Sequence, residues 1–289
     1  MDTHTLETPE VDLTYDVRGP LPPTDGHPVL LMAGHPMEAG GFAALAEHLD
    51  DRTVITYDPR GVGRSERKDG REDRIPSMHA ADLHALITHL GAGPVDVFAS
   101  SGGAVNALEL VATHPDDVRI LVAHEPPVLA ELPDAEWAVA AERAFMGAYQ
   151  QRGSSWGMAG FMAFTSWQGE FTPDYVEQPL PDPAAFGMPV DDDGSRDDPL
   201  LSGTGAAITA YRPDYAALRA ASTRVVMAAG VESRDTVTGR TAASVAAGLG
   251  EMLVMFPSHH GGFLGGELGW SGEPEAFAVR LHEVLDAPT

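Results

Sequence analysis

Residues 95–112 constrain the fold of this chain more than any other stretch. A short apolar run ends at the sequence Ser-Ser-Gly-Gly, and a helix-forming run follows without a spacer. A strand that passes directly into a helix needs backbone angles that most residues resist, so small residues must flank the turn. Ala99 lies two residues before Ser101 and Gly103 lies two residues after it, which is the small-x-Ser-x-small spacing of a nucleophile elbow. Ser101 is therefore the predicted nucleophile.

A Ser/Gly-rich loop between a strand and a helix can also hold phosphate. This loop contains no Lys or Arg that would pair with phosphate, and neither the P-loop nor the dinucleotide glycine spacing is present. In an elbow, the backbone N–H of the residue after the serine points at the same place as the serine oxygen. The elbow interpretation is favoured, and Gly102 is then one oxyanion donor.

Short apolar runs alternate with helical segments along most of the chain. The expected strands cover residues 13–17, 28–33, 53–57, 95–99, 119–124, 224–230 and 252–256. The expected helices cover residues 42–49, 77–90, 104–112, 136–150, 241–249 and 274–285. The alternation predicts an α/β fold with a mostly parallel central sheet flanked by helices. It lapses between about 132 and 223, where a Pro/Asp-rich stretch (181–199) predicts an irregular, mobile loop.

Chemically useful residues follow the predicted strands directly. In open parallel sheets, reactive groups gather beyond the carboxyl ends of the strands. The residues in this position are Gly34, His35, Asp58, Ser101, Glu125, Glu232 and His260. Their shared position is the main reason to expect one site at that edge of the sheet.

Composition excludes several classes of function. The chain has 43 acidic and 18 basic residues, a net charge of −25, which repels nucleic acid and anionic membranes. Cysteine is absent, so disulfides and thiolate chemistry are excluded. No apolar run approaches the roughly 18 residues of a membrane span, and the N-terminus does not look like a signal peptide. We expect a cytoplasmic monomer or homodimer that acts on a small molecule without a metal or cofactor.

With these residues placed, the chain resembles the α/β-hydrolase superfamily, and within it the serine hydrolases with a cap domain. The matching marks are Gly34-His35-Pro36, the segment Asp-Pro-Arg-Gly-Val-Gly-Arg-Ser at 58–65, the Ser101 elbow and His260-Gly261-Gly262-Phe263. The resemblance implies a hydrolase core at residues 1–132 and 223–289 and a helical cap at 133–222. The segment 58–65 looks like a structural turn, and it is assigned no chemistry.

Serine needs a base within hydrogen-bond reach, and His259 and His260 are the candidates. The family pattern places the base immediately before the Gly-Gly pair, which selects His260. His259 is then a neighbouring surface histidine. A metal site is disfavoured, because adjacent side chains diverge and no third ligand is evident nearby.

The acid that orients the imidazole has two candidates. The usual family position, after the strand ending at Gly230, falls on Ser233, with Glu232 beside it. Some members carry the acid one strand earlier, where this chain has Glu125, followed by the rigid Pro126-Pro127. Glu125 is preferred and Glu232 is the alternative.

The second oxyanion donor should come from the loop after the strand at 28–33. The family's His-Gly-x-Pro reads here as Ala-Gly-His-Pro, so the resemblance selects the backbone N–H of His35, because Pro36 cannot donate. The His35 side chain either lines the pocket or lies at the surface.

A serine nucleophile argues against dehalogenases and epoxide hydrolases, which attack with a carboxylate on a similar fold. The apolar residues expected to line the substrate pocket are Met37, Trp156, Phe161, Met162, Trp167 and Phe263. They favour hydrolysis of an uncharged, fairly hydrophobic ester or lactone. The alternatives are a carbon–carbon bond hydrolase, a cofactor-free perhydrolase, and a relative without activity that binds a small ligand.

Overall fold

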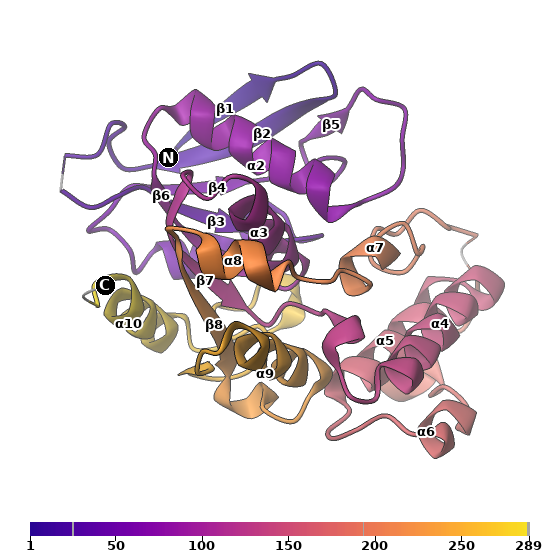
Figure 1. Ribbon diagram of the computed structural model, residues 1–289. Coiled ribbons are helices and arrows are strands. Elements are labelled where there is room, and N and C mark those ends of the chain that lie inside the picture. Colours follow the sequence, from indigo (N-terminus) through magenta and orange to yellow (C-terminus); the bar gives the residue numbers. More distant parts are fainter. Residues whose placement is uncertain (25, 193, 288–289) are drawn as a thin grey trace.

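A computed structural model describes residues 1–24, 26–192 and 194–287. A nine-stranded sheet forms the centre in the order β1-β2-β4-β3-β6-β7-β8-β9, with β5 paired to β2 (Figure 1). The strands are β1 (Asp2–Glu7), β2 (Val11–Arg18), β3 (Leu30–Ala33), β4 (Val54–Tyr57), β5 (Glu66–Arg67), β6 (Val95–Ser100), β7 (Val118–His124), β8 (Arg224–Gly230) and β9 (Val254–Phe256). The predicted α/β fold with a mostly parallel sheet is confirmed.

The six strands from β4 across to β9 are parallel, whereas β2 is antiparallel to β1, β4 and β5. Every residue of β3 and β6 is buried. This explains the unbroken apolar sequence of β3, because a parallel strand covered on both faces has no solvent side. In β6 the buried Asp96 accepts two hydrogen bonds from Arg119. Because the strands are parallel, the carboxyl ends of β3, β6, β7 and β8 lie side by side at one edge of the sheet.

Helices cover both faces of the sheet (Figure 1). They are α1 (Ala43–Ala46), α2 (Pro76–Leu90), α3 (Gly102–Thr113), α4 (Ala135–Arg152), α5 (Ser154–Ser166), α6 (Pro173–Glu177), α7 (Ala206–Thr209), α8 (Tyr215–Ala220), α9 (Val237–Leu249) and α10 (Pro274–Leu285). One face packs against α2, α3, α8 and α9, and the other against α1 and α10. The sheet is thus the middle layer of three.

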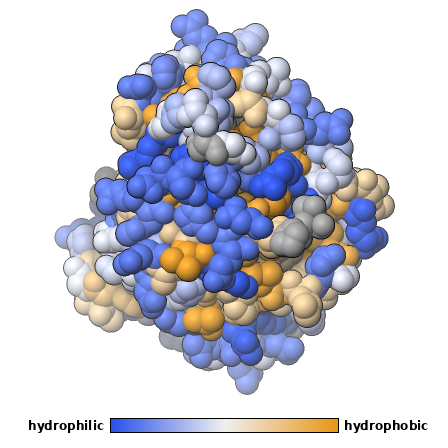
Figure 2. Space-filling view, turned by 90° about the vertical axis from the view of Figure 1, so that its left-hand side faces the viewer, coloured by the Kyte–Doolittle hydropathy of each residue, from blue (hydrophilic) through white to orange (hydrophobic). Residues whose placement is uncertain are grey.

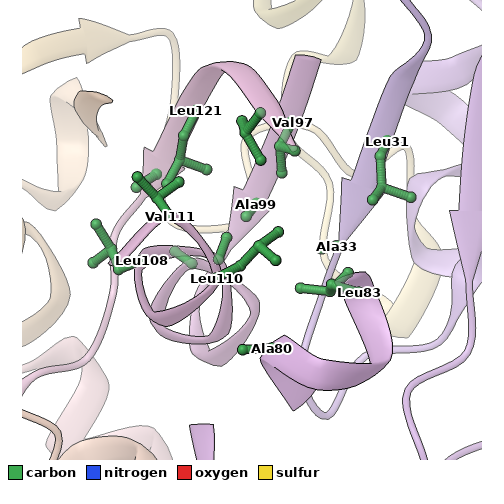
Figure 3. Close-up of a cluster of buried hydrophobic side chains, with 14 of the residues drawn as sticks. Leu31, Ala33, Ala80, Leu83, Val97, Ala99, Leu108, Leu110, Val111 and Leu121 are labelled. Atoms are coloured by element: carbon green, nitrogen blue, oxygen red, sulfur yellow. The ribbon is translucent and has the colours of Figure 1, made fainter. Parts of the chain in front are cut away.

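The first of these interfaces buries aliphatic side chains from strands and helices together. Leu108 and Val111 of α3 lie on the same side of the sheet as Leu121, and Leu83 of α2 lies beside Ala33 of β3 (Figure 3). All five are fully buried. Each buried Leu or Val side chain stabilises the fold by about 2 kcal/mol relative to an exposed one. This packing holds α3, and with it the turn at its N-terminus, rigidly on the sheet.

The segment between β7 and β8 leaves the sheet. Helices α4, α5 and α6 pack together around an apolar cluster of their own, and Figure 1 shows them standing apart from the strands. Helix α8 lies in the same segment but contacts α3 and α9 beside the sheet. The division into a core (1–132 and 223–289) and a cap (133–222) stays a prediction.

Two elements near the N-terminus differ from the sequence-based expectation. Strand β1 was not expected, because its residues are mainly exposed and polar; it is an edge strand held by backbone pairing with β2. The helix expected at 42–49 is reduced to α1, preceded by a 3₁₀ turn at Ala39–Phe42. The turn begins early because the Ala39 N–H donates to Asp58 Oδ1 at 2.9 Å.

The segment 58–65 forms a structural turn. The Asp58 carboxylate also accepts hydrogen bonds from the backbone N–H of Arg64 at 2.9 Å and from its Nε at 2.8 Å. The Ser65 hydroxyl donates to the Asp58 carbonyl at 2.7 Å. These bonds close the loop on itself and leave Asp58 buried at the edge of the sheet.

One face of the molecule is mainly hydrophilic (Figure 2). On this face polar residues predominate and apolar residues form small, separate spots. Across the part of the chain that the structure describes, no helix is both long enough and apolar enough to cross a membrane.

Candidate active site

Ser101 occupies the sharp turn between β6 and α3. Its backbone has φ 57° and ψ −130°, a conformation that non-glycine residues rarely adopt. Its N–H donates to the His124 carbonyl at 2.9 Å, which fixes the turn to the neighbouring strand β7. A Cβ on Gly103 would lie 2.3 Å from the Ala33 carbonyl oxygen. A glycine is thus needed at position 103, two residues after the serine, because α3 and β3 approach each other closely there.

Glu125 comes directly after β7 and contacts the histidine expected as the base. Its Oε2 lies 2.6 Å from Nδ1 of His260, which follows β9. The same oxygen accepts from the Thr238 hydroxyl at 2.6 Å, and Oε1 accepts from the Gly230 N–H at 2.8 Å. With three donors around two oxygens, the ionised carboxylate is well satisfied although it is fully buried. The contact with Nδ1 fixes the orientation of the imidazole.

The environment of Glu125 keeps it ionised. Burial alone would raise its pKa, but the charge and hydrogen bond of His260 outweigh burial, and His124 and Thr238 act in the same direction. The pKa of Glu125 is therefore well below its usual value. Its φ of 50° is a second strained backbone position at this edge of the sheet.

Glu232, the alternative acid, lies elsewhere. It is exposed and lines the mouth of a cavity, and among the described residues it forms no ion pair with His260. The geometry brings Glu125, and not Glu232, to the imidazole. The catalytic role of Glu125 stays a prediction.

Ser101 and His260 line the same cavity. Within residues 1–24, 26–192 and 194–287, the Ser101 hydroxyl has no hydrogen-bond partner, and so it is not yet bonded to Nε2 of His260. Catalytic hydrogen bonds are often long without substrate and tighten when it binds. The carboxylate–imidazole pair is thus formed, and the serine lines the same cavity as the imidazole.

The two backbone N–H groups expected to bind an oxyanion come from adjacent segments. A Cβ on Gly102 would lie 2.8 Å from the carbonyl oxygen of His35, so the two backbones nearly touch. Among the described residues, neither N–H donates to a backbone acceptor. The His35 ring is buried against His79, at 4.4 Å between centroids, and His35 is among the residues that line the cavity. Burial, aided by the charge of Arg74, lowers the pKa of His35 to about 3, so the ring is neutral.

Sequence reasoning missed His124, which lies beneath the site. Its ring is fully buried and stacks on that of His260 at 6.1 Å between centroids, and its Nδ1 lies 3.2 Å from the Ser100 hydroxyl. Burial lowers the pKa of His124 to about 4, although the neighbouring Glu125 opposes the shift. The only sequence feature that could have indicated His124 as a residue near the site is its position at the end of the strand β7.

A cavity of about 510 Å³ opens over Ser101. Phe161 and Met162 line it, as the sequence indicated, and Phe145, Met146 and Trp270 do so as well. Most of its surface is apolar, and no Lys or Arg of the described residues lines it. It suits a fairly hydrophobic small molecule.

Four residues expected in the pocket do not line it. Met37 packs against the core beside α1, and Phe263 is buried between Phe42 and Phe98 under the sheet edge. These two belong to the core because they lie on the side of the sheet that α1 and α10 cover.

The other two are tryptophans that turn away from the cavity for local reasons. Trp156 stacks under the Arg152 guanidinium, and its Nε1 donates to the Val190 carbonyl at 3.3 Å. Trp167 donates to the Glu170 carbonyl at 3.1 Å and packs against Tyr175. In both cases the indole N–H is satisfied by a nearby loop, which fixes the ring outside the cavity.

Comparison with known proteins shows what this chain is similar to. The family model described as "alpha/beta hydrolase fold" matches residues 27–153. An uncharacterized hydrolase of Bacillus subtilis, YraK, is 37% identical over 126 residues, which cover 43% of this chain and 45% of that protein. The chain thus spans less than half the length of the curated relatives that it matches.

Solved structures match over the whole chain at low identity. A hydrolase from Pseudomonas aeruginosa has a TM-score of 0.65 and 20% identity, with 99% of each chain covered. A thermophilic esterase from Thermogutta terrifontis has a TM-score of 0.61 and 21% identity, with 99% of this chain and 98% of that chain covered. These likenesses concern the fold. The chain therefore has the fold of these hydrolases, and its residues 27–153 match the α/β-hydrolase family model.

Proposed function

We propose that the protein is a serine hydrolase that cleaves an uncharged, fairly hydrophobic carboxylic ester or lactone through an acyl-enzyme. The observation that carries the proposal is the 2.6 Å contact between Glu125 and His260, because His260 lines the same largely apolar cavity as Ser101. A buried ionised carboxylate that fixes an imidazole next to a serine on a strained turn is the arrangement that activates a hydroxyl for attack.

The acylation step follows from the positions of these groups. With Nδ1–H of His260 donated to Glu125, Nε2 is free to accept the proton of Ser101. The serine oxygen bonds to the substrate carbonyl carbon, and the carbonyl electrons move onto its oxygen. The N–H groups of Gly102 and His35 are the available donors for that oxyanion. Removing one such donor typically costs about 10²–10³ in rate.

Collapse of this intermediate breaks the bond to the leaving oxygen. His260, now cationic, gives its proton to the leaving alcohol or, in a lactone, to the ring oxygen. Water then attacks the acyl-enzyme, with His260 again accepting a proton, and releases the acid and Ser101. Glu125 stays ionised throughout and stabilises the imidazolium, consistent with its lowered pKa.

The decisive experiment combines labelling with turnover. Wild type and Ser101→Ala are treated with a fluorophosphonate probe and assayed with aryl esters and macrolactones. We expect labelling and hydrolysis only with Ser101 present. No labelling and no serine-dependent turnover of any ester or lactone would refute the proposal. Product analysis separates hydrolysis from perhydrolysis or carbon–carbon bond cleavage.

The ligand-binding alternative is favoured by one observation. The Ser101 hydroxyl makes no hydrogen bond to His260 among the described residues. If this separation persists when a ligand is bound, the cavity captures its ligand without reacting. A crystal structure with a covalent serine inhibitor would show whether the bond forms, and failure of the inhibitor to attach would favour the binding protein.

A further inference from the structure

Glu142 is a buried acid in the cavity that the proposed mechanism does not use. It lies on α4, where Ala138, Ala141 and Phe145 form the buried face, and its side chain lines the same cavity as Ser101. Only 6% of Glu142 is exposed. A carboxyl group on the apolar face of a helix normally has a partner, because burial without one is costly.

The partner of Glu142 is a neutral hydroxyl. The Thr209 side chain at the end of α7 forms a hydrogen bond with the Glu142 carboxyl group, which makes no ion pair with any of the described residues. Arg143, the next residue on α4, is exposed and lowers the pKa of Glu142 only in part. Helix α5, which packs on α4, has no titratable side chain.

Apart from one tyrosine, the titratable groups on α6 and on the turn before α4 are carboxylates, which cannot act as counter-ions. Helix α6 carries Asp174, Tyr175 and Glu177, and the turn before α4 carries Glu131, which accepts from Tyr215. The other titratable residues that line the cavity are His35, Glu232, His259 and His260. None of these is a cation with a fixed charge, so the cavity offers Glu142 no permanent counter-ion.

Burial raises the pKa of Glu142 to about 7, and the Thr209 hydroxyl and Arg143 oppose this shift only partly. The carboxyl group is therefore poised between its neutral and charged forms near neutral pH. A hydrophobic, uncharged substrate that fills the cavity removes the remaining water, which favours the neutral acid further. The neutral acid carries an O–H donor in the largely apolar cavity that Glu142 lines.

We propose that Glu142, as a neutral carboxylic acid, is the residue that determines specificity in this cavity and donates a hydrogen bond to an oxygen of the substrate outside the ester group that is cleaved. The substrate class is then a hydrophobic ester or lactone with a second oxygen acceptor, such as a ketone or an ether. This inference rests on the proposed function for its substrate, but not for the binding of that second oxygen.

Stronger donors than Glu142 are missing from the cavity. No Lys or Arg of the described residues lines it, and its other side-chain donors are hydroxyls, an amide, an indole N–H and the histidines near Ser101. An acceptor that replaces water on a buried acid gains a hydrogen bond that an alkyl chain cannot make. Glu142 would thus discriminate between two substrates that differ only in that oxygen.

The test compares 4-nitrophenyl octanoate with analogues in which one methylene at a time, from C4 to C7, is replaced by a ketone. The measured quantity is the ratio of kcat/KM for each analogue to that of the parent between pH 5.5 and 8.5. Protonation of His260 affects both esters equally and cancels in the ratio. We expect the best analogue to be preferred about 10-fold or more at pH 6, with the preference declining as the pH rises through about 7.

Two variants separate the hydrogen bond from the shape of the cavity. Glu142→Gln keeps a donor that cannot ionise, so the preference should persist without the decline at high pH. Glu142→Met keeps the volume without a donor, so the preference should disappear while the parent ester is still cleaved. An equal preference in Glu142→Met would overturn the proposal. A second result would also overturn it: a preference for the 4-nitrophenyl ester of 8-amino-octanoate over the parent ester that grows with pH and requires Glu142. In that case the ionised carboxylate would bind a cationic substrate, and the neutral acid would not be the form that acts.

Binding keeps this test independent of turnover. In Ser101→Ala, calorimetry with the methyl esters of the same acids should show the same preference, and adding Glu142→Met should abolish it. If wild type hydrolyses none of the esters but this binding preference holds, the proposed function fails and the role of Glu142 stands. If esters are cleaved but no analogue is preferred at any position, the proposed function stands and the role of Glu142 fails.

Discussion

Replacing Glu125 by Gln tests the arrangement around the imidazole most directly. The Gly230 N–H donates to Oε1 at 2.8 Å and cannot turn away, because it belongs to the backbone at the end of β8. The glutamine amide must therefore present its oxygen to Gly230 and its NH₂ group to His260. The NH₂ group donates to Nδ1, so the proton of the neutral ring moves to Nε2.

A ring that carries its proton on Nε2 cannot accept the proton of Ser101. The same tautomer error in a well-studied serine protease lowers kcat by about 10⁴. We expect Glu125→Gln to lower kcat by about 10³–10⁴, which corresponds to about 4–5 kcal/mol in the activation barrier. KM should change little, because Glu125 is not among the residues that line the cavity.

The assay is steady-state hydrolysis of an aryl ester at pH 8, with circular dichroism to confirm folding. Glu232→Gln is the matched control, because Glu232 is exposed and lies outside the contact with His260. It should keep nearly normal turnover. The reasoning is refuted if Glu125→Gln remains active while Glu232→Gln abolishes activity, since the acid would then follow β8.

Two further predictions concern stability. Gly103→Ala should destabilise the protein strongly, because the new Cβ would lie 2.3 Å from the Ala33 carbonyl oxygen. Gly147→Ala, in open space on α4, should stabilise the protein by roughly 0.5–1 kcal/mol. Urea titrations that rank the two variants in the opposite order would contradict this. Burial lowers the pKa values of His35, His79 and His124, so as the pH falls these three rings are protonated in the unfolded state before they are protonated in the folded state. Stability should fall as the pH drops below about 6.5, by about 1 kcal/mol per unit for each ring, and an unchanged melting temperature between pH 7.5 and 5.5 would disprove it.

The opposing contribution to this pH dependence comes from Glu142. Its folded pKa of about 7 lies above the unfolded value, so it stabilises the protein at low pH and loses that stabilisation as the pH rises through about 7. The stabilisation by Glu142 offsets the stability that about one of the three histidine rings loses as the pH falls. The net loss below pH 6.5 should therefore be smaller in wild type than the histidines alone would give, and larger in Glu142→Gln.

The sequence was informative wherever backbone topology decides position. Ser101, Glu125 and His260 all follow strands, and in a parallel sheet these ends meet, so their proximity followed from alternation and spacing. The choice between Glu125 and Glu232 could not be made in this way, because both follow strands at the same edge. It required the orientation of the carboxylate, which depends on Thr238 and Gly230.

Side chains of the segment between β7 and β8 were much harder to predict. Trp156 and Trp167 are as apolar as Phe161, but their indole N–H groups bind nearby carbonyls and turn the rings away. Glu142 was overlooked although a signal existed, namely a charged residue on the apolar face of α4 three positions before Phe145. Such details depend on helix packing, which periodicity does not specify.

The pairing of β6 with β7 aligns Ser100 with His124, one residue before Ser101 and Glu125, the proposed nucleophile and acid. Those two groups are thus joined by a short, rigid connection that is complete before the chain enters α4, and only the histidine comes from beyond α8. Shortening, lengthening or exchanging the intervening helices would alter which molecules are admitted and leave the alignment of proton donor and acceptor untouched. The helices between β7 and β8 can therefore change the ligand preference of this chain without moving Ser101 and Glu125.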